Sequence, residues 1–161
     1  MFEFEKTPLY NPDDDGIKHI NIYSQGRTEL GRMLSNFYHS PFTFEPYGTF
    51  QSAEGFYFWY LTGQVHHELK YMYGAEAKKA GTKYRTERLD VLGLTEDDLK
   101  VMMQMLVHKV LQNENILSLL KSSTLPFVHY YSYHERVVIP NGVDWLSGLY
   151  EDIRTALCDG N

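Results

Sequence analysis

Glu54 is the acidic residue whose sequence surroundings best suit proton transfer. It lies among apolar neighbours in the segment Phe50-Gln51-Ser52-Ala53-Glu54-Gly55-Phe56-Tyr57. A carboxyl group in such surroundings either serves as a helix-capping group or has a raised pKa suited to acid–base chemistry. If a helix starts after Ser52, Glu54 falls in its first turn, where a carboxylate suits the helix dipole. The local sequence leaves both roles open.

Lys78 and Lys79 are the candidate cations. The pattern predicts a short helix over residues 75–80, ended by Gly81. Neighbouring helical residues point about 100° apart, so one lysine at most can face a cleft. The alternative is that both lysines are surface residues in solvent.

Metal and nucleotide motifs are missing from the sequence. His66 and His67 are adjacent and cannot share a metal ion from one helix. His129 and His134 with Glu135 could act as ligands, but a surface loop explains them better. The chain has no P-loop, no G-x-G-x-x-G after a strand and no G-x-S-x-G elbow. We therefore expect no metal and no cofactor.

Composition limits the class of protein. The 161 residues suffice for one domain, and 43% hydrophobic with 22% charged residues is ordinary for a globular protein. The net charge of −6 argues against a protein that coats nucleic acid, but a pocket for one nucleotide needs only a few local cations. No apolar stretch is long enough for a membrane-spanning helix, and the single Cys158 fits a reducing cytoplasm. We expect a cytoplasmic protein that does not bind membranes.

Aromatic residues are abundant, with 13 Tyr and 9 Phe. They either fill the core or line a cleft that stacks on a planar ring. Composition does not separate these two interpretations.

The hydrophobic pattern predicts an α+β domain that is mainly helical and has a small β-sheet. Residues 1–16 read as an irregular N-terminal arm, and residues 17–161 as the single domain. The strands are expected within 17–23, 42–44, 127–131 and 136–139. The helices are expected from Ser52 onward, at 66–73, 75–80, after Thr95, at 116–120 and at 144–157, with a loop or short helix in 24–36.

The helix after Thr95 has the clearest amphipathic pattern. Thr95 is an N-cap candidate, followed by Glu96-Asp97-Asp98 in the first turn. A stripe of apolar residues follows at offsets of three and four, and the core is the better interpretation of its methionines. The stripe consists of Leu99, Met102, Met103, Leu106, Val107, Val110 and Leu111.

Five short motifs follow one another along the chain. The first two are Leu34-Ser35-Asn36-Phe37, continued by Ser40-Pro41-Phe42, and Ser52-Ala53-Glu54-Gly55-Phe56-Tyr57. The others are Glu76-Ala77-Lys78-Lys79-Ala80-Gly81, Lys109-Val110-Leu111-Gln112-Asn113, and Gly142-Val143-Asp144-Trp145-Leu146-Ser147 with Arg154 behind it. In this order, over roughly residues 20–157, they resemble the motifs of the YbiA-like, or NADAR (NAD and ADP-ribose associated), family.

The resemblance implies a compact, mainly helical α+β fold and N-glycosidase activity, the cleavage of a bond between ribose C1′ and a nitrogen. Family substrates are ribosylated, phosphorylated compounds, among them an early riboflavin-pathway intermediate and ADP-ribose attached to guanine in nucleic acid. Carried over by position, Glu54 and Lys78 are the catalytic candidates. The substrate-binding candidates are Asn36, Phe37, Tyr57 and Asp144.

These residue types suit the implied reaction. Breaking a C1′–N bond develops oxocarbenium-like positive charge on the ribose. A carboxylate can stabilise that charge or activate water, and aromatic rings can stack on the leaving base. A lysine can hold a phosphate or, if desolvated, attack C1′ as an amine. The sequence does not choose among these roles.

The chain departs from the family pattern at four places. Glu135-Arg136-Val137-Val138-Ile139 stands where D-x-x-W-G is usual, and Gly55 replaces a His. Asp144 replaces an Asn and Ser147 a Gly, so a negative charge stands where an amide is expected. If Asp144 faces the ligand, it repels phosphate. The alternative function is therefore a module that binds an ADP-ribose- or NAD-derived ligand without hydrolysing it.

Overall fold

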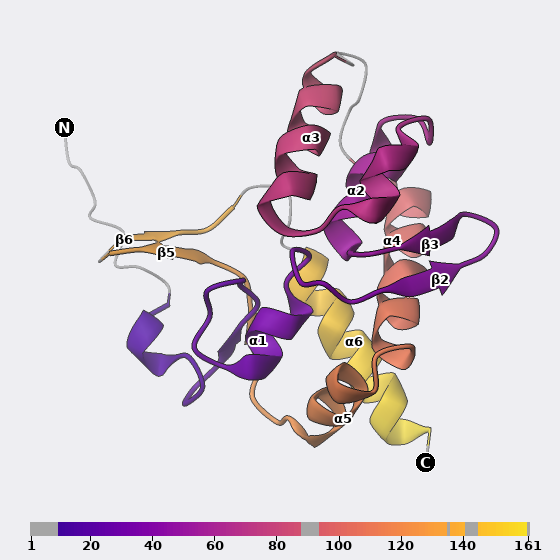
Figure 1. Cartoon of the computed structure of the whole chain (residues 1–161). Helices are drawn as coiled ribbons and strands as arrows, with labels where there is room; N and C mark the ends of the chain where they lie inside the picture. The colour runs from indigo at the N-terminus through magenta and orange to yellow at the C-terminus, as the bar shows by residue number, and fades with distance from the viewer. Residues whose placement is uncertain (1–9, 88–93, 135, 141–144, 161) are drawn as a thin grey trace.

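Six α-helices make up about half of the part of the chain that the computed structural model describes, residues 10–87, 94–134, 136–140 and 145–160 (Figure 1). The α-helices are α1 (Glu29–Leu34), α2 (Ala53–Leu61), α3 (Gly74–Glu87), α4 (Glu96–Leu111), α5 (Glu114–Ser122) and α6 (Trp145–Asp159). The 3-10 helices are η1 (Pro12–Asp14) and η2 (His67–Tyr71). The predicted α+β class, mainly helical, is confirmed.

The strands are short and form three separate pairs within the described residues. The parallel pair is β1 (Ile20–Asn21) with β4 (Phe127–Val128), in which Ile20 faces Phe127. The antiparallel pairs are β2 (Phe42–Phe44) with β3 (Gly48–Phe50), and β5 (Tyr131–Tyr133) with β6 (Arg136–Val138). The predicted strand over 127–131 is thus two strands, and each belongs to a different pair.

Helix α2 begins where the sequence predicts. The Ser52 side chain accepts a hydrogen bond from the backbone N–H of Gly55 at 3.0 Å. Phe56, Phe58 and Trp59 are all buried, so α2 is a helix of the core. Many of the aromatic residues therefore do fill the core.

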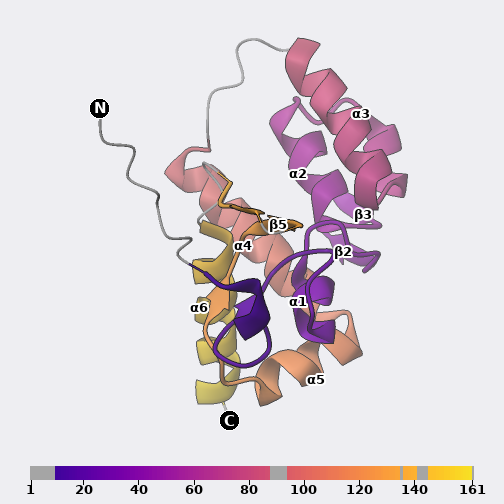
Figure 2. The ribbon, with the colours of Figure 1, turned by 90° about the vertical axis from the view of Figure 1, so that its left-hand side faces the viewer.

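The prediction that a helix ends at Gly81 is wrong, because α3 continues to Glu87. A Cβ atom at Gly81 would overlap the side chain of Phe58 on α2. The glycine is therefore needed where two helices cross closely, and Figures 1 and 2 both show α3 lying beside α2. The helix predicted at 66–73 is also different, because the chain there forms the shorter 3-10 helix η2.

Helix α4 packs against α6, and α5 contacts both helices near one end of the pair (Figures 1 and 2). Its predicted N-terminus is a capping box, in which Thr95 and Asp98 each accept from the other's backbone N–H. Met102 and Leu106 of the predicted stripe are buried, whereas Leu111 is exposed. The face also buries Lys109, which a hydrophobic pattern does not reveal. None of the described helices has the length and apolar character needed to cross a membrane.

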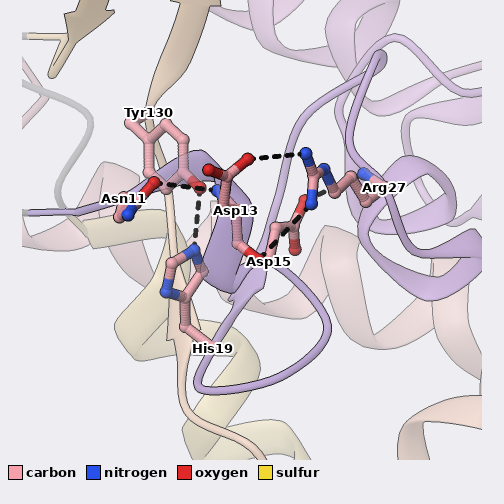
Figure 3. Close-up of polar contacts among 6 residues, drawn as sticks. All are labelled: Asn11, Asp13, Asp15, His19, Arg27 and Tyr130. Carbon is pink, nitrogen blue, oxygen red and sulfur yellow. Dashed lines mark hydrogen bonds and ion pairs between the residues drawn. The ribbon is translucent and has the colours of Figure 1, made fainter.

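Residues 10–16, the described part of the predicted arm, pack against the segment that follows β4. The ring of Tyr10 stacks on that of Tyr130 with centroids 5.4 Å apart. The His19 ring nitrogen Nε2 is 2.7 Å from the Tyr130 hydroxyl, a contact drawn in Figure 3. Asp15 is buried and accepts hydrogen bonds from the backbone N–H groups of Asn21 and Arg27. This network fixes the chain on both sides of β1.

Candidate functional site

A cavity of about 200 Å³ lies where the loops around β1 and α1 meet α2, α3 and the start of α6. It contains five of the six site residues expected from the sequence, namely Asn36, Phe37, Glu54, Tyr57 and Lys78. The sixth, Asp144, lies outside the described residues. The remaining lining residues are Tyr23, Ser24, Gln25, Ser35, His129, Tyr131, Tyr133, Trp145 and Leu146.

The three-residue loop Ser35–Phe37 is held by its backbone carbonyls, each bonded to a different helix. The Ser35 carbonyl accepts from the Lys109 ammonium of α4 at 2.9 Å. The carbonyl of Asn36 accepts from the Glu54 backbone N–H of α2, and that of Phe37 from the Gly74 N–H at the start of α3, both at 2.9 Å. The loop therefore sets Asn36 and Phe37 in the cavity wall and fixes their position relative to Glu54.

Glu54 is the buried acid of the cavity. Its side chain lies in the first turn of α2, and the residue is 9% exposed. Burial raises the pKa of Glu54 to about 7, although the charge of Lys78 opposes part of that rise. A carboxyl group with such a pKa exchanges its proton readily at neutral pH, which suits acid–base catalysis. The Ser52 side chain, rather than Glu54, supplies the side-chain cap of this helix.

Lys78 is an exposed residue at the rim of the cavity. Its ammonium nitrogen lies 5.8 Å from the ring centroids of both Phe37 and Tyr131. The charge near the mouth can attract an anionic group of a ligand, as lysines do for phosphates. Lys79 is exposed and does not line the cavity.

Aromatic rings and one unpaired amide complete the wall. The ring of Tyr57 stacks on that of Trp145 with centroids 6.4 Å apart. Buried Asn36 Oδ1 has no hydrogen-bond partner among the described residues. An unpaired buried acceptor is costly, so this oxygen is suited to accept a hydrogen bond from a hydroxyl or N–H of a ligand. The cavity thus combines ring-stacking surfaces with a small set of polar groups.

The family that the chain resembles has a histidine at the position of Gly55, and the packing around this residue explains why the chain has glycine here. A Cβ atom at this position would overlap the carbonyl oxygen of Leu69 in η2. Because η2 lies directly against the first turn of α2, no larger side chain fits here.

The segment after β4 supplies cavity residues that the sequence did not indicate as a ligand site. His129 and Tyr131 lie in the wall, about 100 residues away in sequence from Phe37 and Tyr23 on the other side. By sequence, His129, His134 and Glu135 are possible metal ligands, although a surface loop explains them better. Glu135 lies outside the described residues. Within the described parts of the chain, no three His, Cys, Asp or Glu side chains gather as a metal site would require.

The fold and cavity together define an α+β domain with one buried acid in an aromatic, partly enclosed pocket. No family model matches the chain, and neither any curated protein nor any solved structure is significantly similar to it.

Proposed function

We propose that this protein is an N-glycosidase that hydrolyses the ribose C1′–N bond of a ribosylated nucleotide derivative. The observation that carries the proposal is the environment of Glu54. Its carboxyl group lies in the cavity wall, where burial raises its pKa to about 7. Cleavage of this bond needs a group that transfers a proton or stabilises developing positive charge. The five motifs that resemble the YbiA-like family supply the reaction class.

The contents of the cavity agree with a ribose attached to a planar ring. Its volume of about 200 Å³ lies below the ~300–1,000 Å³ typical of sites for drug-sized ligands. It would therefore enclose one sugar and its attached ring rather than a whole dinucleotide. The Tyr57 and Trp145 rings offer a stacking surface, and Lys78 at the rim suits a phosphate that remains outside.

Two substrates fit this description, ADP-ribose attached to guanine and a ribosylamino intermediate of the riboflavin pathway. Each can be offered to the purified protein, together with NAD, and the released base or amine quantified by liquid chromatography and mass spectrometry. We expect turnover of one of them by the wild-type protein. Tight binding without any product would instead support the alternative function, a module that captures an ADP-ribose-derived ligand.

Substitutions in the cavity test the site itself. Glu54→Gln keeps the shape of the side chain and removes its ionisable proton, so turnover should fall by roughly 10²–10⁴-fold. Lys78→Met should strongly reduce turnover or the affinity for a phosphorylated substrate, whereas the matched control Lys79→Met should be near wild type. Near wild-type rates in Glu54→Gln, or a loss at Lys79 with none at Lys78, would contradict the assigned site.

A further inference from the structure

We propose that His129 is a second catalytic residue of this cavity and that its Nε2 atom is the general base for the attacking water. The proposal rests on the proposed N-glycosidase function and names the group that activates the nucleophile. It is carried by the position of the ring in the cavity wall and by a hydrogen bond that fixes its tautomer.

The hydrogen bond leaves a single neutral tautomer. His129 Nδ1 lies 2.6 Å from the backbone carbonyl oxygen of Ile22. A carbonyl oxygen only accepts, so Nδ1 carries the hydrogen and donates it. In the neutral ring, Nε2 then has a free lone pair. No described residue is hydrogen-bonded to Nε2, so this lone pair is available to a molecule in the cavity.

The surroundings keep the ring uncharged. Burial lowers the pKa of His129, and the hydrogen bond to Ile22 opposes this in part. The titratable groups that share the cavity with His129 are Tyr23, Glu54, Lys78, Tyr131 and Tyr133. Glu54 and His129 are thus shifted in opposite directions from their usual pKa values, the arrangement expected of an acid and a base that work together.

Tyr131 connects the two groups in space. Its ring lies edge-on to that of His129, with centroids 5.5 Å apart. Burial and then the charge of Glu54 raise the pKa of Tyr131, so the Glu54 carboxylate is close to the same ring. His129 and Glu54 therefore both lie near one aromatic side chain, in the wall of the same cavity.

The backbone on both sides of His129 is held rigidly. The side-chain amide of Asn21 donates to the Tyr130 carbonyl and accepts from the Tyr130 N–H, both at 2.9 Å. The Tyr130 hydroxyl meets His19, as Figure 3 shows. Because β1 and β4 pair next to this point, the imidazole is positioned by the network around residues 15–21. A fixed ring is what general-base catalysis requires.

The proposed step balances with water as the co-reactant. His129 Nε2 takes a proton from water as the water oxygen forms its bond to C1′. The C1′–N bond breaks, and its electron pair goes to the leaving nitrogen, which receives the proton of the Glu54 carboxyl group. The step leaves Glu54 as a carboxylate and His129 as an imidazolium, and proton exchange with solvent restores both.

The test compares His129→Asn with His134→Asn in single-turnover assays on the substrate identified for the wild type. Asn at 129 keeps a donor for the Ile22 carbonyl but has no nitrogen at the Nε2 position. We expect a loss of roughly 10²–10⁴-fold. His134 is exposed, has a positive φ that Asn tolerates and does not line the cavity, so its variant should be near wild type. In His129→Ala, added imidazole should restore part of the rate, which a purely structural role would not allow.

Three results would overturn the proposal. A His129→Asn rate within about twofold of wild type would remove His129 from the reaction while leaving the N-glycosidase function intact. A nitrogen NMR spectrum of the wild-type protein should show His129 protonated on Nδ1 and bare on Nε2, and the opposite tautomer would exclude the base role even if a variant failed to fold. Failure of the wild type to turn over any ribosylated substrate would reject both the proposed function and this step.

Discussion

Glu54 is placed where it is useful for chemistry and costly for stability. Its carboxyl group ionises near a pH of about 4.5 in an exposed setting and near about 7 in the fold. The folded protein therefore holds this proton more tightly than the unfolded chain between those two values. The contribution of Glu54 to stability is consequently most favourable at low pH and is lost as the pH rises through about 7.

Replacing Glu54 by Gln should therefore stabilise the protein while it removes activity. The difference in the free energy of unfolding between Glu54→Gln and wild type should grow by roughly 2–3 kcal/mol from about pH 5 to about pH 8. Urea unfolding followed by circular dichroism at the two pH values measures this difference. A difference that does not change with pH would show that the carboxyl group ionises normally in the fold.

The crossing of α2 and α3 controls where Lys78 lies. Gly81 is three residues after Lys78 on α3, and at Gly81 the helix packs directly on Phe58. Any side chain here separates the two helices and moves Lys78 relative to Glu54 on α2. The crossing thus links core packing to the geometry of the cavity.

Gly81→Ala should destabilise the protein by about 1–3 kcal/mol, the usual effect of overpacking, even though alanine favours a helix. Gly148→Ala is the matched control, because it lies in α6 and a Cβ atom there would contact nothing within 4 Å. The control should gain up to about 1 kcal/mol from helix propensity. Thermal unfolding of both variants measures this contrast, and equal shifts would mean that α2 and α3 are not in close contact at Gly81.

Lys109 links the cavity loop to the core and makes the stability of the whole molecule depend on pH. It is fully buried on α4, where burial lowers its pKa to about 7, and it donates to the Ser35 carbonyl of the cavity loop. In the unfolded chain this amine is protonated below a pH of about 10.5, whereas in the folded protein it is protonated only below about 7. The contribution of Lys109 to stability is therefore most favourable at high pH and is lost as the pH falls towards about 7.

The combined contribution of Glu54 and Lys109 to the stability of the protein should be least favourable near pH 7. Between about pH 7 and about pH 10, Lys109→Met should remove the rise in stability that Lys109 causes, just as Glu54→Gln removes the acid-side slope. Chemical unfolding of wild type and both variants across the pH range measures the two slopes. An alkaline slope that survives in Lys109→Met would assign it to other groups.

The local sequence determined those features that depend on neighbouring residues. Ser52 and Thr95 begin helices because a side-chain oxygen accepts from a backbone N–H two or three residues on. The stripe with Met102 and Leu106 predicted the buried face of α4, because helical periodicity is short-range. The α+β class follows from these elements. The motifs around Asn36, Glu54 and Lys78 also named residues that the structure brings into one cavity.

The tertiary structure alone decided what depends on residues far apart in the chain. His129 enters the cavity because β4 pairs with β1, about 100 residues earlier, and nothing near His129 in the sequence encodes that pairing. Gly81 looks like a helix end until Phe58 is seen against it. Lys109 looks like a surface cation until the Ser35 carbonyl is found beside it in the core. A pKa shift arises from burial, and burial is a property of the packed chain rather than of any short segment.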